Sequence, residues 1–241
     1  MLAGRGVAKV FKGGPAVLRD VDIEIPAGKA TILLGASGSG KSTLIRALAL
    51  LDAPTSGAIT IDDLQYVFPE LGDGNPLPPW PSVTVVFQSL FLFPHLSLRA
   101  NIVLPVRRSL TPGKRAWIER LTTALSITDL LERYPNQVSV GQRQRAALAR
   151  ALALEPRYVL LDEVTSALDV EHVSAVSKLL LETKAKNIGM LVSTHLLGFA
   201  RDVGDEFVFL DQGTIIERGE MSTLSDPTHP RVRQFIAQTS G

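Results

Sequence analysis

Short apolar segments recur toward both ends of the chain in patterns typical of strands. Residues 21–25 alternate apolar and acidic side chains, which is the period of two expected for a strand with one buried face. Residues 31–34, 158–161 and 190–193 are continuous apolar runs, as in strands that are buried on both faces. Further strands are predicted at residues 58–61 and 83–87, and a hairpin is predicted at residues 206–217.

Helical patterns separate these strands and dominate the middle of the chain. Residues 43–51 have helical composition directly after a buried strand, and residues 173–184 have it between the last two apolar runs. Residues 116–125 and 142–154 show helical periodicity within a long segment that has few strand signals. We therefore expect helices both between the strands and grouped in one central block.

The order of these segments predicts the domain organisation. Strands that alternate with helices are typical of an α/β fold, and the central helical block interrupts that alternation. We expect a single domain over residues 1–241, in which an α/β core formed by residues 1–88 and 156–241 is interrupted by a helical insert at residues 89–155.

A proline-rich stretch at residues 65–82 stands out within the predicted core. It carries five prolines and two glycines, and proline lacks the backbone N–H that a helix or a central strand needs. We therefore predict a surface loop. The loop is either a tolerated insertion or a functional contact, and the sequence leaves both interpretations open.

Composition narrows the class of protein further. The chain of 241 residues is 45% hydrophobic with a formal net charge of +1, which argues against a mainly disordered chain and against a general basic coat for nucleic acid. It has no cysteine and four scattered histidines, so a disulfide framework or a thiolate metal site is not expected. No apolar run approaches the roughly 20 residues that span a bilayer. These features predict a soluble, cytoplasmic protein.

The sequence GASGSGKST at residues 35–43 matches the phosphate-binding loop pattern of Gly, four residues, Gly, Lys and Ser or Thr. Glycines let the backbone N–H groups curl around phosphate, and the helix that follows aims its positive end at the same anion. Lys41 can reach the β- and γ-phosphates, and the Ser42 hydroxyl can bind Mg²⁺. The predicted ATP-binding residues are Gly35, Ala36, Ser37, Gly38, Ser39, Gly40, Lys41, Ser42 and Thr43.

A second acidic motif follows the predicted strand at residues 158–161. Asp162 stands at the end of this strand, where its carboxylate can hold Mg²⁺ beside the phosphate loop. Glu163 comes next and can orient or deprotonate an attacking water. We therefore assign Asp162 to a metal site and Glu163 to catalysis.

Residues 138–152 read VSVGQRQRAALARAL, and here the chain resembles the ATP-binding cassette (ABC) transporter ATPases. The signature peptide of that family is usually Leu-Ser-Gly-Gly-Gln before a helix rich in Gln and Arg. Ser139, Gly141 and Gln142 match it, whereas Val140 replaces the first glycine. If that position requires a positive φ, we expect a β-branched valine there to be strained.

Four more residues fit the family in its order along the chain. Phe11 matches the aromatic residue that stacks on adenine, and Gln88 matches the glutamine that joins the Mg²⁺ site and faces the transmembrane partner. Asp169, in Ser-Ala-Leu-Asp, matches the D-loop that crosses to the opposite subunit. His195 matches the histidine that senses the γ-phosphate. Val164 departs from the family, which usually has proline after the catalytic glutamate.

The resemblance implies a P-loop NTPase fold, a RecA-like core with an N-terminal antiparallel β region and a helical subdomain. It implies that two cassettes sandwich two ATP molecules, with ATP and Mg²⁺ as cofactors. The implied roles are catalysis for Glu163, His195 and Lys41, metal binding for Ser42, Gln88 and Asp162, and contact in trans for Ser139, Val140, Gly141 and Gln142. Implied partners are a second copy, two transmembrane permease subunits and, indirectly, an extracytoplasmic solute-binding protein, without nucleic acid.

Residues 91–106, FLFPHLSLRANIVLPV, resemble the ATP-binding proteins of polar amino acid importers, and so does the C-terminal tail. The apolar stretch either packs within the insert or docks onto a membrane partner, and the implied location is the cytoplasmic face of the cell membrane. One alternative is a nucleotide-gated, weakly hydrolysing regulatory subunit, and another is a non-transport cassette of translation or DNA repair. A simple P-loop kinase or GTPase leaves the signature peptide unexplained.

Overall fold

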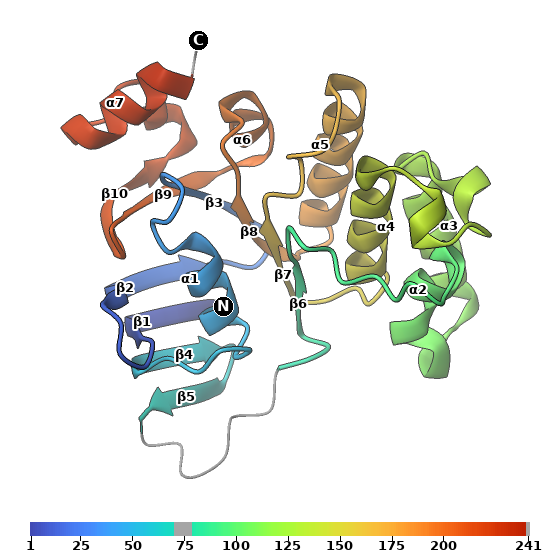
Figure 1. Ribbon diagram of the computed structural model, residues 1–241, viewed down its shortest axis with the longest axis horizontal. Helices are drawn as coiled ribbons and strands as arrows, with labels where there is room; N and C mark the ends of the chain where they lie inside the picture. The colour runs from blue at the N-terminus through green and yellow to red at the C-terminus, as the bar shows by residue number, and fades with distance from the viewer. Residues whose placement is uncertain (70–78, 240–241) are drawn as a thin grey trace.

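The computed structural model describes residues 1–69 and 79–239, and its strands form two sheets (Figure 1). The first sheet is antiparallel and has the strand order β2-β1-β4-β5. Its alternating segment, residues 21–25, belongs to β2, in which Val21, Ile23 and Ile25 are buried. The strands are β1 (Leu2–Val10), β2 (Ala16–Ile25), β4 (Ser56–Ile61) and β5 (Leu64–Phe68).

The second sheet has six strands in the order β10-β9-β3-β8-β7-β6. All of its strand pairs are parallel except the hairpin of β9 and β10. Every residue of β3, β7 and β8 is buried, as the continuous apolar runs predict. The strands are β3 (Ala30–Leu34), β6 (Val83–Val86), β7 (Tyr158–Asp162), β8 (Gly189–Ser193), β9 (Glu206–Asp211) and β10 (Thr214–Glu220).

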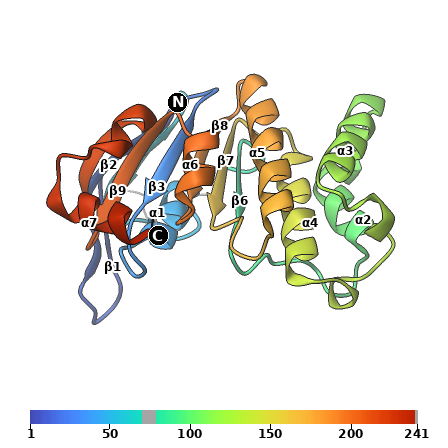
Figure 2. The ribbon, with the colours of Figure 1, turned by 90° about the horizontal axis from the view of Figure 1, so that it is seen from above.

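Every regular element between β6 and β7 is a helix, and Figure 2 shows α2, α3 and α4 together beyond the β6 edge of the sheet. The α-helices are α1 (Lys41–Leu48), α2 (Leu98–Val103), α3 (Pro112–Ala124), α4 (Val140–Leu152), α5 (Val170–Ala185), α6 (Leu197–Val203) and α7 (Pro230–Thr239). The 3-10 helices are η1 (Leu104–Ser109), η2 (Thr128–Leu130), η3 (Pro135–Gln137) and η4 (Met221–Ser225).

Two apolar clusters lie on opposite faces of the six-stranded sheet. One joins side chains of α1, such as Ile45, to the antiparallel sheet and to Leu33, Leu160 and Leu191. The other joins residues of α2, α3 and α4 to the opposite face of the same sheet and to α5 and α6. The central helices therefore share a continuous core with the sheet, which fixes the position of α4 relative to β7.

One sequence-based prediction is wrong in part. The loop predicted at residues 65–82 begins as strand β5, whose residues pair with β4 from Leu64 to Phe68. Its first proline is Pro69, so the strand ends where proline first removes a backbone donor. Residues 70–78 of the predicted loop lie outside the described residues.

The helices of the described chain are also too short or too polar to cross a membrane. Among residues 1–69 and 79–239, none combines the necessary length with sufficient apolar character.

Candidate nucleotide-binding site

The predicted site residues converge because four parallel strands end at the same edge of the sheet. β3, β8, β7 and β6 are neighbours in that order, so their carboxyl ends lie side by side. The phosphate loop follows β3, and Gln88 follows β6 by two residues. Asp162 ends β7, and His195 follows β8 by two residues. Ligands of open α/β sheets characteristically bind at such an edge.

A cleft of about 400 Å³ opens at this edge, and we call it the phosphate cleft. It brings together residues of four segments: the start of β2, the phosphate loop, the end of β6 and the end of β7. Its lining consists of Val17, Ser37, Gly38, Gly40, Lys41, Ser42, Thr43, Gln88, Asp162 and Glu163. Eight of the residues predicted to bind ATP or metal, Lys41 among them, therefore face one space together with the predicted catalytic glutamate.

The phosphate loop requires glycine where it passes closest to its neighbours. Gly35 has φ +149°, and a Cβ there would lie 2.2 Å from the carbonyl oxygen of Leu210, so a larger residue does not fit. Lys41 begins α1, and its ammonium donates to the carbonyl oxygens of Gly35 (2.7 Å) and Ala36 (3.0 Å). Burial lowers the pKa of Lys41, while the negative charges of Glu163 and Asp162 act in the opposite direction.

The two acidic residues are held by β8. Ser193 pairs with Asp162 across the sheet, and its hydroxyl donates to Asp162 Oδ1 at 2.7 Å. The backbone N–H of Glu163 donates to Ser193 O at 3.1 Å and also contacts Ser193 Oγ at 3.2 Å. Glu163 has φ +52°, in the left-handed region that costs a non-glycine residue about 1–2 kcal/mol. Its carboxylate oxygen Oε2 lies 4.0 Å from His195 Nδ1.

The other predicted site residues lie outside the lining of the phosphate cleft. Phe11 is 46% exposed with Lys9 Nζ 5.1 Å from its ring centroid, a position open to a ligand ring. Asp169 caps α5, and the N–H and ring of His172 hold the pKa of Asp169 below its ordinary value. Ser139 caps α4: its hydroxyl accepts from the N–H of Gln142 (3.2 Å), whose side chain accepts from the N–H of Ser139 (2.8 Å).

The expectation of backbone strain at Val140 is wrong. Val140 is the first residue of α4, directly after the cap, and it is not among the non-glycine residues with positive φ. A valine adopts helical backbone angles without a steric clash. Its side chain is 52% exposed, so it presents an apolar group to solvent at the end of the helix.

The comparisons with known proteins are consistent with this geometry. The family model described as ABC transporter matches residues 18–166 of the chain. This chain belongs to the ABC transporter family. Family membership confirms the predicted P-loop NTPase fold class, and as a member the chain is an ATPase that binds nucleotide.

Its relatives match over nearly their whole length. The chain is 39% identical to the glutamate transport ATP-binding protein GluA of Corynebacterium glutamicum, over 99% of this chain and 98% of that protein. It is 38% identical to the arginine transport ATP-binding protein ArtM of Bacillus subtilis, over 98% of each. An ATP-binding cassette dimer in a post-hydrolysis state with ADP and phosphate superimposes with a TM-score of 0.77 at 28% identity, over 92% of this chain and 99% of that one.

Sequence reasoning missed three residues of the cassette that touch the site. Val17 lines the phosphate cleft from β2, and Ser193 binds both acidic residues, as described above. Gln144, on α4, contacts the backbone of Glu163. The position of Ser193 at the carboxyl end of a buried strand was a partial signal, since it places the hydroxyl at the same edge as Asp162, but it does not show that β8 pairs with β7. Nothing in the local sequence signals Gln144 or Val17.

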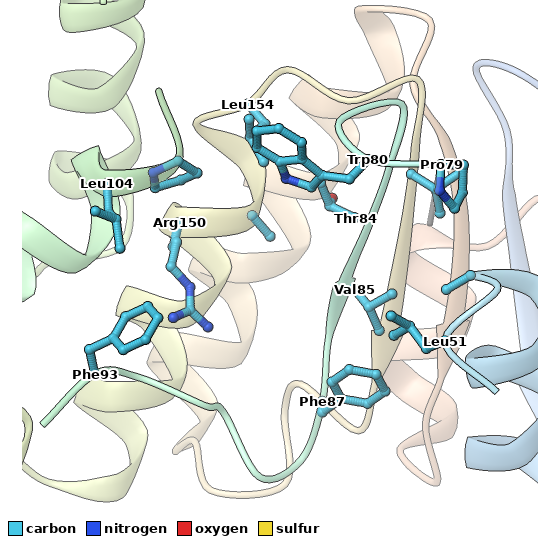
Figure 3. Close-up of a pocket in the computed structure, with 14 residues that line it drawn as sticks. Leu51, Pro79, Trp80, Thr84, Val85, Phe87, Phe93, Leu104, Arg150 and Leu154 are labelled. Carbon is cyan, nitrogen blue, oxygen red and sulfur yellow. The ribbon is translucent and has the colours of Figure 1, made fainter. Parts of the chain in front are cut away.

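A second hollow of the cassette lies between the sheet edge and the central helices (Figure 3). It is a groove of about 330 Å³ with a mostly apolar lining. Phe93 and Leu104 reach it from the predicted apolar stretch, whereas Leu98, Ile102 and Val106 of the same stretch are fully buried. Part of the stretch therefore packs in the core, and part of it lines an open groove.

Proposed function

We propose that this chain is the ATP-hydrolysing subunit of an importer of amino acids or similar small polar solutes. The observation that carries the proposal is the phosphate cleft, where a complete phosphate loop faces Asp162 and Glu163. The two relatives described above are named for the transport of glutamate and of arginine, which supports amino acids as the class of solute. The individual solute is chosen by partner proteins.

The phosphate loop would bind the β- and γ-phosphates through its backbone N–H groups and Lys41. The N-terminus of α1 begins at Lys41, so the positive end of the helix dipole and the ammonium act on the same anion. In the structure Lys41 donates to two carbonyl oxygens of its own loop, contacts that a phosphate oxygen would replace. Phe11 would stack on the adenine ring.

Glu163 would orient the attacking water and accept its proton, and His195, 4.0 Å away, would contact the γ-phosphate. Ser42, Gln88 and Asp162 suit Mg²⁺, because a hydroxyl, an amide and a carboxylate supply the oxygen ligands that this ion prefers. Asp162 is 5% exposed with one oxygen bound by Ser193, which leaves the other free for a cation. The ion would neutralise phosphate charge.

The signature segment, residues 139–142, would complete the site of a second copy. It begins α4 and does not belong to the lining of the phosphate cleft, so within one chain it has no nucleotide to contact there. An exposed helix N-terminus can bind an anion through its free N–H groups. The dimeric cassette described above supports a homodimer in which Ser139, Val140 and Gly141 face the ATP of the partner, with Asp169 crossing nearby.

The groove of Figure 3 would receive one transmembrane permease subunit, so that a pair of cassettes binds two such subunits. Phe87 lines this groove and the next residue, Gln88, lines the phosphate cleft, so one segment touches both hollows. Pro79 and Trp80, from the end of the proline-rich stretch, also line the groove, which favours a functional contact for that part of it. The cassette would lie on the cytoplasmic face of the membrane and act indirectly with a solute-binding protein.

The predicted division into an α/β core (1–88 and 156–241) and a helical insert (89–155) would suit this arrangement. The groove lies where these two parts meet, since it is lined both by strand β6 and by α4. Movement of the insert relative to the core would therefore alter the groove and the position of the signature segment together.

A weakly hydrolysing regulatory cassette is less well supported. Such a reading rests on Val140 and Val164, but Val140 carries no backbone strain and Val164 is buried in the core. Glu163 and His195, which a degenerate site commonly loses, lie close together at the sheet edge.

Uptake in cells tests the transport proposal. Cells that carry Glu163→Gln in place of the parent chain should lose uptake of one amino acid from a labelled panel of glutamate, glutamine, arginine and cystine. Uptake of the other members serves as the internal control. Unchanged uptake of the whole panel would contradict the assignment to amino acids. If the purified parent chain still hydrolyses ATP, its role as an ATPase is not affected by that result.

A further inference from the structure

Gln144 connects α4 to the segment that follows β7. Its side chain is 3% exposed and uses both ends of its amide: Nε2 donates to the carbonyl oxygen of Glu163 at 2.9 Å, and Oε1 accepts from the N–H of Ala167 at 3.3 Å. A buried amide with both ends paired is strongly constrained in position. Gln144 therefore ties the helix that Ser139 caps to the predicted catalytic residue.

Glu163 needs such support because its backbone is unfavourable by itself. With φ +52°, the residue lies in the left-handed region, which persists only where the surroundings hold it. Ser193 holds the N–H of Glu163, as described above. Two donors hold its carbonyl oxygen: the N–H of Ser166 at 3.2 Å and the amide of Gln144. Gln144 is the only one of these partners that comes from the helical part of the chain.

The helix also approaches this segment closely one turn earlier. A Cβ at Gly141 would lie 2.7 Å from the carbonyl oxygen of Ala167. Gly141 and Gln144 are three residues apart and so share one face of α4. That face is packed on the segment from Glu163 to Leu168, so a shift of α4 cannot leave the segment unchanged.

We propose that Gln144 is a positioning residue for hydrolysis, which couples the orientation of Glu163 to the placement of the signature helix. The coupling rests on the proposed function of Glu163 as the residue that orients and deprotonates water. When α4 is seated against the partner's nucleotide, Gln144 holds the Glu163 carbonyl and thereby the direction of its carboxylate. ATP binding itself does not depend on Gln144, because the residue does not line the phosphate cleft.

The test compares Gln144→Met with a control that removes another buried hydrogen bond on α4. Methionine has similar length but neither donates nor accepts as the amide does, so we expect kcat at saturating ATP to fall about tenfold with KM for ATP within about twofold. Trp117→Phe removes the bond from Trp117 Nε1 to Leu152 O (3.0 Å) at the far end of the helix. We expect this control to lower Tm by a comparable amount and to keep the parental kcat.

A double-mutant cycle separates positioning from general destabilisation. If Gln144 acts through Glu163, adding Gln144→Met to Glu163→Gln causes no further fall in single-turnover hydrolysis. If Gln144→Met lowers the rate of hydrolysis by the same factor in the parent and in Glu163→Gln, the inference is overturned. A parental kcat for Gln144→Met alone also overturns it. Should Gln144→Met lower Tm far more than the control, Gln144→Glu decides: burial favours the protonated carboxyl, which still donates to Glu163 and accepts from Ala167, so a kcat as low as that of Gln144→Met overturns the inference.

The same experiment distinguishes a failure of the proposed function. Near-parental hydrolysis by Glu163→Gln alone removes Glu163 from its catalytic role, and the inference falls with it. Loss of hydrolysis in Glu163→Gln together with parental kcat in Gln144→Met refutes the coupling only.

Discussion

The phosphate loop and the signature segment are both predicted to contact nucleotide, but they differ in how the rest of the chain surrounds them. Residues 35–43 follow a buried strand and face a cleft whose other walls come from β6 and β7. Residues 139–142 begin a helix, and their polar groups are largely occupied in capping it. The half of the predicted site that contains the phosphate loop is therefore enclosed by residues of the same chain. The other half, the signature segment, lies on the surface.

This difference separates two kinds of residue. A residue of the enclosed half has partners in the same chain, so its substitution should act on each copy independently. A residue of the signature segment should act only where two copies meet.

Glu163→Gln should reduce hydrolysis about a thousandfold, because removing a positioned general base costs about 10²–10⁴ in rate. ATP binding should persist, since the loop and Lys41 are unchanged. Phosphate release and equilibrium nucleotide binding measure the two quantities. Glu155→Gln is a matched control, because Glu155 pairs with Lys186 (3.6 Å) outside the lining of the phosphate cleft. Near-parental hydrolysis by Glu163→Gln would remove this residue from the mechanism.

Ser139→Asn tests the surface half, because asparagine caps a helix about as well as serine. We expect Tm to change little and hydrolysis to fall about tenfold, since a charge-assisted contact to phosphate contributes roughly 1.5–3 kcal/mol. Mixing this variant with Glu163→Gln should then restore activity, to about a quarter of the parent if dimers form at random. In a mixed dimer one of the two sites combines an intact Glu163 with an intact Ser139.

Recovery on mixing depends on the arrangement in trans. If Ser139 instead served the nucleotide of its own chain, each subunit would keep its own defect and the mixture would show no more activity than the average of the two variants. Light scattering with ATP confirms that dimers are present, so a lack of recovery would count against the shared site itself.

The same comparison shows why some features could be predicted from the sequence. The phosphate loop is contiguous, and its strand, glycines and helix follow one another directly within residues 31–51. Gln144 and Ser193 escaped because their contacts join residues 19 and 31 positions apart. Those contacts depend on how α4 packs on the sheet and on which strand β8 pairs with, and local patterns do not encode either.

The expectation of backbone strain at Val140 is wrong for a different reason. Ser139 and Gln142 form the Ser-x-x-Gln pattern of a capping box, which places the intervening residues in the first turn of a helix. That pattern by itself predicts helical angles for Val140, and helical angles leave no strain to expect.

Val140→Gly should therefore have the smallest effect of the three. There is no positive φ to relieve, so we expect hydrolysis to change by less than about twofold, with a loss of up to about 1 kcal/mol in stability from the lower helix propensity of glycine. Val140→Ala is the matched control, because it removes most of the side chain and favours the helix. A rise in turnover of several-fold in both variants would show that the valine side chain crowds the partner's terminal phosphate. A rise in the glycine variant alone would show instead that the dimer bends this backbone into a conformation that the single chain does not adopt.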